Sequence, residues 1–171
     1  MKKTLIIALS CLVVLLAACK KPVEPTPEPV DYALNYIGNY IGQFTLTINS
    51  MNNQPQSGLS FPIDSISMDI AKGENINAIT ATVTVEDESH QTSGTATAEK
   101  ADFGTVQLVI DKPDQNYYFS LNLMMEGRKA ESDTLNIIGT FSGNGNFTLP
   151  TGDVVPLDEV SGNVSGKLGK Q

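Results

Sequence analysis

The sequence predicts an all-β protein, an antiparallel up-and-down barrel of about eight strands. From residue 36 onward, apolar and polar residues alternate with a period of two, as in a strand with one buried face. Thr, Val and Ile are abundant in these segments, and polar turns separate them at short, regular intervals. Strands joined in this order favour an antiparallel meander, which loses its exposed edges when it closes into a barrel. A sandwich of two sheets is the alternative.

The first two predicted strands, 36–49 and 59–70, each carry an irregularity. In the first, one face is formed by Tyr36, Gly38, Tyr40, Gly42, Phe44, Leu46 and Ile48. Glycines inside a strand mark a bend, a bulge or a close approach of another backbone. The second strand changes phase at Asp64 and Ser65, which indicates a bulge or two short strands.

Six further segments continue the pattern, at 79–85, 92–100, 106–110, 117–126, 135–143 and 160–168. The segment 92–100 is polar and is expected at a sheet edge. The segment 117–126 alternates most regularly, with Tyr117, Phe119, Leu121, Leu123 and Met125 on one face. Between the last two strands, a turn at 142–146 leads into a short apolar segment at 147–149.

The N-terminal segment has the parts of a secretory signal. Lys2 and Lys3 give it a positive start, and an apolar run from Leu5 to Ala18 follows. This run is shorter than the roughly 20 residues that a membrane-spanning helix needs. We therefore interpret residues 1–18 as a cleaved signal peptide.

The end of this signal, Leu16-Ala17-Ala18-Cys19, resembles the lipobox of bacterial lipoproteins. The resemblance implies acylation of the Cys19 thiol, cleavage before Cys19, and acylation of the new α-amine. Two or more acyl chains anchor a protein stably, whereas one chain binds only marginally. We expect a chain anchored through Cys19 to the outer membrane of a Gram-negative bacterium, on its periplasmic or its exposed side.

Residues 19–31 are predicted to form the lipidated cysteine and a tether. The prolines at 22, 25, 27 and 29 favour polyproline II, a semi-rigid spacer of roughly 30 Å at about 3.1 Å per residue. The remaining residues, 32–171, are expected to form one domain.

The charge of the mature chain excludes some partners. The whole sequence has 11 Lys and Arg against 19 Asp and Glu, and loss of Lys2 and Lys3 with the signal gives a net charge of about −10. This argues against nucleic acid, which binds through Lys and Arg, and against anionic lipid beyond the anchor itself. Because Cys11 leaves with the signal and Cys19 carries lipid, the fold has no disulfide.

Catalytic and metal-binding patterns are not found, so we predict no enzyme activity, no cofactor and no metal site. His90 is the one histidine, and we interpret it and the acidic residues 86–88 as an exposed turn. The chain has no Gly-x-Ser-x-Gly motif for a nucleophile. Carboxylates such as Asp64 and Asp69 occur on one strand, but their separation in space does not follow from the sequence.

A resemblance to a fold family rests on three glycine-containing segments. Gly38-Asn39-Tyr40-Ile41-Gly42, Gly139-Thr140-Phe141-Ser142-Gly143 and the segment 160–166 resemble strands of the calycin-like, or lipocalin-like, barrel domains of bacterial lipoproteins. This resemblance implies the barrel fold. True lipocalins carry a Trp in their first strand, and this sequence has no Trp.

Two functions follow as hypotheses. The first is a non-catalytic binding module for a small apolar or glycan-like ligand. Its barrel interior would be lined by Tyr36, Tyr40, Phe44, Phe61, Phe119, Leu121, Leu123 and Phe141. The second is an interaction subunit or enzyme inhibitor of an envelope complex, with a solid core and a sizeable exposed apolar patch. Because a barrel of about eight strands is either packed solid or holds one small ligand, and aromatic residues are few, we expect a mostly packed interior.

Overall fold

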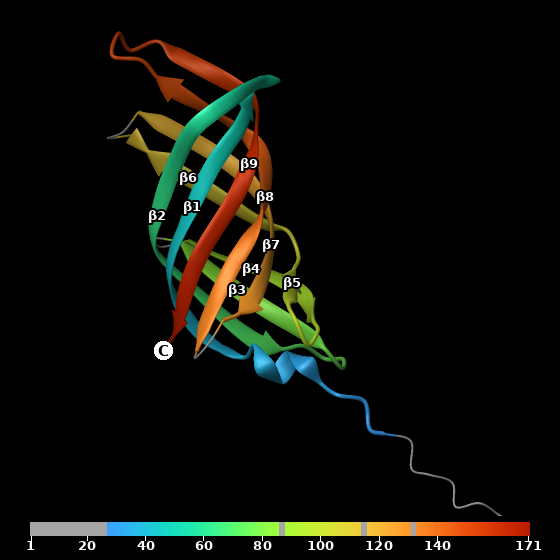
Figure 1. Cartoon of the computed structure of the whole chain (residues 1–171). Coiled ribbons are helices and arrows are strands. Elements are labelled where there is room, and N and C mark those ends of the chain that lie inside the picture. The colour runs from blue at the N-terminus through green and yellow to red at the C-terminus, as the bar shows by residue number, and fades with distance from the viewer. Residues whose placement is uncertain (1–26, 86–87, 114–115, 131–132) are drawn as a thin grey trace, which may run out of the picture.

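The computed structural model describes residues 27–85, 88–113, 116–130 and 133–171 (Figure 1). The predicted signal peptide, Cys19 and most of the tether lie outside these residues. The elements are η1 (Tyr32–Asn35), β1 (Gly38–Met51), β2 (Gln54–Lys72), β3 (Ala78–Val85), β4 (Glu88–Ala96), β5 (Ala101–Phe103), β6 (Val106–Lys112), β7 (Tyr117–Lys129), β8 (Thr134–Thr148) and β9 (Val154–Lys170). In the described part of the chain, no helix is long and apolar enough to cross a membrane.

The strands form one antiparallel sheet in the order β5-β4-β3-β2-β1-β9-β8-β7-β6. A further pairing of β5 with β7 closes eight of these strands into a ring, and β6 is attached to β7 alongside β5. The predictions of an all-β fold, of antiparallel pairing and of a meander that returns to its first strand are confirmed. The ring differs from a regular barrel because its two ends are built differently.

Unequal hairpins explain this difference. Strands β1 and β2 have 14 and 19 residues, whereas β3 and β4 have 8 and 9. The pairing of β2 with β3 begins only at Ile66, so the part of β2 before Ile66 has β1 as its one described neighbour. In Figure 1, the β3–β4 hairpin accordingly covers only the lower part of the ring, and the upper part is open between β2 and β6.

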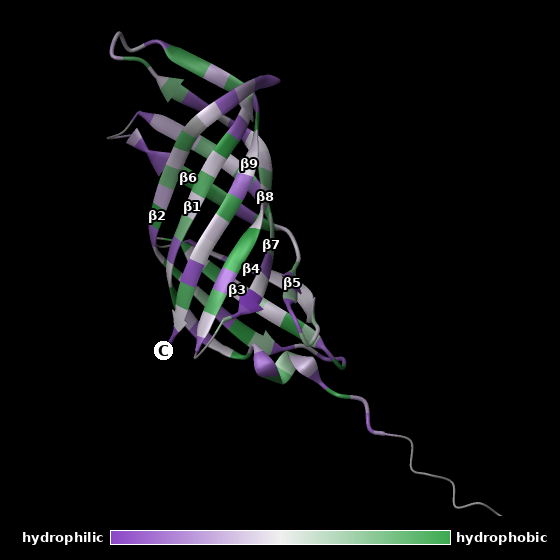
Figure 2. Ribbon diagram, viewed as in Figure 1, coloured by the Kyte–Doolittle hydropathy of each residue, from purple (hydrophilic) through white to green (hydrophobic). Residues whose placement is uncertain are grey.

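Hydrophilic and hydrophobic residues alternate along the strands (Figure 2), and the apolar residues of this pattern form the buried core. The predicted inner face of β1 is confirmed, since Tyr40, Phe44, Leu46 and Ile48 are all buried. Glycines on the inner face of β9 leave room for rings from the neighbouring strands. A Cβ on Gly162 would lie 2.7 Å from Cζ of Phe141, and a Cβ on Gly166 would lie 2.5 Å from Cδ1 of Phe44. Aromatic rings packed over strand glycines allow the strong curvature that ring closure requires.

The phase change in β2 is a bulge, as predicted. Phe44 pairs with Ile63 and Gly42 pairs with Ile66, so that Asp64 and Ser65 together oppose the single residue between Gly42 and Phe44. Ser65 adopts a φ of 59°, a left-handed conformation that is unusual for a residue other than glycine. The bulge lies where β2 loses contact with β3.

Two expectations about the middle of the chain were wrong. The strand predicted at 92–100 is β4, which begins at Glu88 and ends at Ala96, and Thr97 donates to Lys100 O in a turn. This strand pairs with β3 along its length and with β5 over Gly94–Ala96, so only its first part has a free side. His90 is therefore not an exposed turn residue. It lies on β4 opposite Val83 and is half-buried.

The 3-10 turn η1 covers the lower end of the ring and fixes the point where the tether begins. The Asp31 carboxylate accepts hydrogen bonds from the backbone N–H groups of Ala33 and Asn77 and forms an ion pair with Lys72. The hydrogen bond from Lys72, followed by that from Asn77, holds the pKa of Asp31 below its usual value. Every described strand and the whole buried core lie beyond Asp31, so the chain from this residue onward contains the complete folded unit.

Candidate functional site

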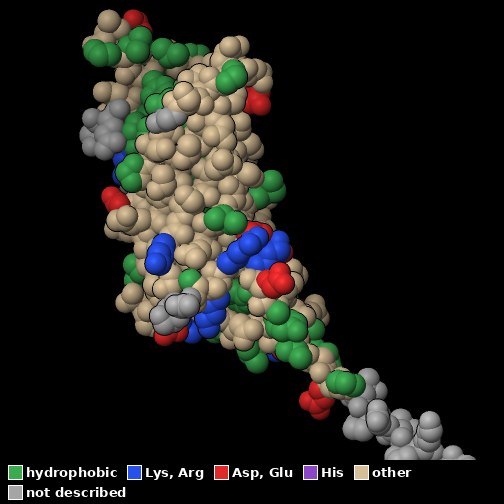
Figure 3. Space-filling view, in the orientation of Figure 1, with side chains coloured by type: hydrophobic (Ala, Val, Ile, Leu, Met, Phe, Trp, Pro, Cys, Tyr) green, Lys and Arg blue, Asp and Glu red, His purple; other side chains and the backbone are tan. Residues whose placement is uncertain are grey.

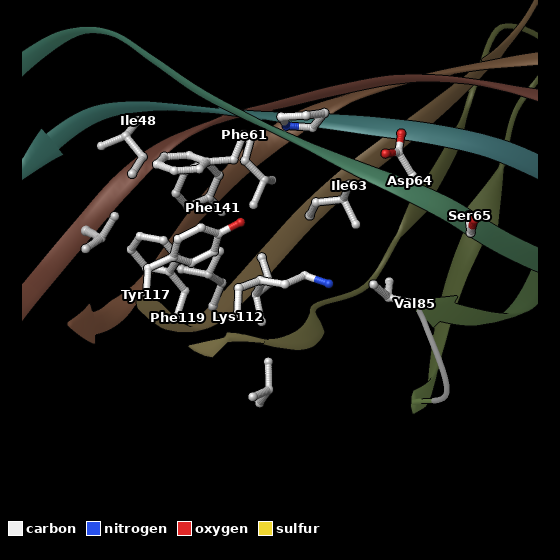
Figure 4. Close-up of a pocket in the computed structure, with 16 residues that line it drawn as sticks. Ile48, Phe61, Ile63, Asp64, Ser65, Val85, Lys112, Tyr117, Phe119 and Phe141 are labelled. Atoms are coloured by element: carbon white, nitrogen blue, oxygen red, sulfur yellow. The ribbon is translucent and has the colours of Figure 1, made fainter. Parts of the chain in front are cut away.

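A cavity of about 340 Å³ lies in the upper, open part of the ring (Figure 4). Strand β2 supplies the segment 61–65, β6 supplies Ile110 and Lys112, and β7 supplies Tyr117, Phe119 and Leu121. Residues of β1, β8 and β9 form the opposite wall. The volume is at the lower end of the range for pockets that bind small molecules.

Aromatic rings from three strands form one end of the cavity. The ring centroid of Phe61 lies 5.3 Å from that of Tyr117 and 5.7 Å from that of Phe119, both in edge-to-face geometry. Phe147 closes the cluster at 5.6 Å from Phe119. The sheet register produces this cluster, since Phe147 pairs with Tyr117, and Phe119 pairs with a glycine, Gly145. Such rings offer an apolar surface of fixed geometry to an incoming group.

The polar groups of the cavity are few and lie on the side of the opening. Lys112 and Tyr117 are opposite each other in the β6–β7 hairpin. In Figure 4, the Lys112 ammonium and the Tyr117 hydroxyl project into the space between β2 and the β6–β7 hairpin. Asp64 and Ser65, on the bulge of β2, border the same space. An apolar interior with a few polar groups at its mouth is the usual composition of a binding pocket.

The structure divides the predicted site residues into two groups. Phe61, Phe119, Leu121 and Phe141 line the cavity. Phe44 and Leu123 belong to the packed core below it, as do Tyr36 and Tyr40 at the lower end of the ring. The prediction of a mostly packed interior therefore describes the lower part of the ring.

Sequence analysis missed two polar contributors to the cavity, Lys112 and the hydroxyl of Tyr117. Tyr117 shares the inner face of its strand with Phe119, and that alternation was the available signal. Lys112 was missed because the strand predicted at 106–110 ends before it, whereas β6 extends to Lys112.

The packed lower end contains one buried polar group that stands out. The Tyr40 side chain is fully buried, and its hydroxyl has no hydrogen-bond partner among the described residues. Burial, assisted by the charge of Asp133 and by Tyr36, raises the pKa of Tyr40. The Lys170 ammonium lies 6.0 Å from the centroid of the same ring. Tyr40 is not among the residues that line the cavity, so its hydroxyl belongs to the core rather than to the site.

An apolar projection stands at the same end of the molecule as the cavity. The β8–β9 hairpin continues past a bulge near Gly143 to a tip at which Leu149, Val154 and Val155 are exposed. Figure 3 shows a group of hydrophobic side chains at this upper end, whereas few hydrophobic or charged side chains are visible on the wall below it. The tip is the largest cluster of exposed aliphatic side chains within one described hairpin.

Several other ionisable side chains of the described residues form ion pairs at the surface. Within the described ranges, no three His, Cys, Asp or Glu side chains are placed to hold a metal ion. The His90 imidazole has Glu88 as a neighbour, with 3.7 Å between Nε2 and the carboxylate oxygen. A surface network joins Glu126 to Lys100 at 2.8 Å and to Arg128 at 2.7 Å. The hydrogen bond from Lys100, followed by that from Arg128, lowers the pKa of Glu126, as expected for a structural ion pair.

Comparison with known proteins gives no family assignment: no protein-family model matches the chain, and no curated protein matches it. The functional argument therefore rests on the geometry of the cavity and its opening.

Proposed function

We propose that this protein is a lipid-anchored binding module of the bacterial cell envelope, without catalytic activity, and that its cavity holds a small apolar ligand. A lipocalin-like role of this kind agrees with the glycine-containing segments described above. The observation that carries the proposal is the cavity of about 340 Å³ beneath an opening in the sheet, with aromatic rings at one end.

The lining favours an apolar ligand over a glycan. Most of the cavity wall is formed by apolar side chains, among them Phe61, Phe119, Leu121 and Phe141. No row of polar side chains from the described residues runs along it. A sugar would have to give up water contacts of its hydroxyl groups in such a cavity, which is costly when they are not replaced. The polar mouth near Lys112 and Tyr117 accommodates a ligand with one polar end.

The experiment uses the chain from residue 20 onward, exported behind a signal peptide that is cleaved without lipidation. This protein reaches the envelope, lacks the anchor and retains the complete folded unit. Protein purified from its native host is extracted with organic solvent, and the extract is analysed by mass spectrometry. A stoichiometric small molecule identifies the ligand class directly. Binding is then measured with the neutral fluorophore aminoanthracene in three proteins: wild type, Leu121→Phe and Asn122→Phe.

Leu121 lines the cavity, whereas Asn122 is exposed on the opposite face of the same strand. We expect saturable binding by wild type and by Asn122→Phe, and binding at least about tenfold weaker for Leu121→Phe, which fills the cavity. Equal binding by all three proteins, with an empty extract, would refute the proposal.

A second function, an interaction subunit of an envelope complex, is favoured by the hairpin tip. Leu149, Val154 and Val155 are 44%, 60% and 39% exposed, whereas most large apolar residues of the described strands are buried. Because Leu149 and Val154 do not line the cavity, we expect their replacement by Ser to leave aminoanthracene binding unchanged, whichever of the two functions is correct. Loss of a co-purifying envelope protein from this variant alone would support the second function.

A further inference from the structure

In the described part of the chain, the edge of β6 that faces the opening pairs with no other strand. Strand β5 pairs with both β4 and β7, and the Gly104 N–H still donates to Ser93 O at 2.9 Å. After Gly104, β6 continues along β7. The part of β4 before Ser93 pairs with β3 and with no other described strand. Among the described pairings, β6 has β7 as its single partner. Its other edge therefore presents backbone N–H and C=O groups at the spacing of a strand.

The two edges that border the opening differ in how they are protected. On the β2 side, Pro62 lacks a backbone N–H, and the bulge at Asp64 and Ser65 twists the edge and adds a charge. On the β6 side, the segment 107–110 contains no proline and no charged residue. Val109 of this segment is 37% exposed and is also one of the residues that border the cavity. Proteins normally protect free edges, so an unprotected edge beside an apolar cavity points to a partner.

The chemistry of this edge specifies the kind of partner. Leu108 and Ile110 point inward, and Ile110 lines the cavity. A strand added beside β6 would likewise turn every second side chain toward the cavity. Only a polypeptide offers donors and acceptors alternating at this spacing, which is the basis of recognition by strand addition.

The charges near the opening restrict the partner further. The exposed Asp111 stands at the end of the uncharged segment of β6, and Asp64 borders the opening from β2. The Lys112 ammonium projects into the same space, so the opening carries two acidic groups and one basic group. The sequence as a whole has a net charge of −8. A segment with a basic residue beside its apolar part complements this arrangement.

We propose that β6 binds an extended segment of another polypeptide as an added strand, with an apolar side chain of that segment seated in the cavity. The segment alternates apolar and polar residues and carries a basic residue at its end. This goes beyond the proposed function, because recognition here depends on the backbone of β6 as well as on the cavity. A small ligand and the segment would compete for the aromatic end of the cavity.

The probe is a short synthetic peptide in which threonine alternates with valine around a central phenylalanine, with a lysine at each end. Its matched control has the same side chains but N-methyl groups on alternate backbone amides, which prevents pairing along one edge. Binding to the chain from residue 20 onward is measured by fluorescence anisotropy, and protection of backbone amides is measured by hydrogen exchange. We expect the peptide to protect amides of β6, and the N-methylated control to bind at least about tenfold weaker.

Two protein variants locate the binding. Gln107→Lys places a charge on the free edge at an exposed position outside the cavity lining, and Met124→Lys places a charge at a 61% exposed position of β7, a strand with partners on both sides. We expect Gln107→Lys to weaken peptide binding at least about fivefold relative to Met124→Lys, because edge lysines oppose strand addition and repel the basic ends. Both variants should bind aminoanthracene as wild type does, which separates this inference from the proposed function.

The inference fails if the backbone amides of β6 are protected neither by this peptide nor by peptides with leucine or tyrosine in place of the central phenylalanine. It also fails if the N-methylated control binds as tightly as the peptide. A third refuting result is a concentration-dependent dimer in sedimentation that Gln107→Lys abolishes, since the partner of β6 would then be a second copy of the chain.

Discussion

The closure of the ring between β1 and β9 can be tested with one methyl group. Gly162 of β9 pairs with Ile48 of β1 on one side and with Phe141 of β8 on the other. A Cβ at this position would meet the carbonyl oxygen of Thr47, and it would lie 2.7 Å from Cζ of Phe141. Real Cβ atoms essentially never approach other heavy atoms closer than 3.0 Å. The ring of Phe141 can move, but the Thr47 oxygen belongs to the backbone of β1, so Gly162→Ala must push two paired strands apart.

Overpacking of this kind costs roughly 1–3 kcal/mol, and we expect about 3 kcal/mol because the contact involves a backbone atom. For a domain of this size, the melting temperature should fall by about 10 °C. Gly169→Ala is the matched control in the same strand, because the nearest atom to its Cβ would be the Ile41 oxygen at 3.9 Å. This control should be neutral or stabilised by about 0.4–1 kcal/mol, since alanine lowers the entropy of the unfolded chain.

Thermal and urea unfolding, followed by circular dichroism, measure both variants. Adding Phe141→Leu to Gly162→Ala should recover only part of the loss, because the clash with Thr47 remains. If the Gly162 and Gly169 variants melt within about 2 °C of each other, the close approach of β1 to β9 at Thr47 is wrong.

Three further predictions concern polar groups. Asp31→Asn should remove part of the acid sensitivity of folding. Because Lys72 lowers the pKa of Asp31 in the folded state, the Asp31 carboxylate stabilises the fold above pH 3.8, and this stabilisation is lost as the pH falls below that value. Unfolding curves between about pH 6 and pH 2.5 would detect the difference between the variant and wild type. Tyr40→Phe should leave the free energy of unfolding unchanged or raise it by about 1 kcal/mol, because it removes a buried hydroxyl without a partner; a loss of that size would instead indicate a bound water. Glu126→Gln should lower the melting temperature slightly in low salt and not in about 1 M salt, since its ion pair with Lys100 is at the surface, and an equal effect in both would contradict this.

The fold was largely predictable because each long strand carries its own pattern. Inner faces of β1, β7 and β9 follow directly from alternation, and the bulge in β2 follows from the phase change at Asp64 and Ser65. The start of β4 was missed because Glu88-Ser89-His90-Gln91 has no apolar alternation, and it forms a strand only because β3 supplies a partner. Tertiary pairing here overrides weak local preference.

The site was predictable only in part, because the cavity depends on where β3 stops pairing with β2. Phe61, Phe119 and Phe141 were correctly placed inside by periodicity. Periodicity gives the same signal for Phe44, which lies in the packed core beneath. The difference arises from the register of β2 with β3, which begins at Ile66 and leaves the upper segment uncovered. No pattern within a single strand encodes that register.

The positions of the tether and the opening restrict where a ligand can come from. Asp31 attaches the start of the folded chain at the lower end, through Lys72 and Asn77, while the cavity opens in the upper part (Figure 1). If the chain is anchored through Cys19, as we propose, the predicted tether of roughly 30 Å and the length of the ring separate the opening from the membrane. A protein that withdrew a lipid from its own bilayer would need its opening at the anchored end. This arrangement instead favours ligands, and extended polypeptide segments, that approach from the aqueous side.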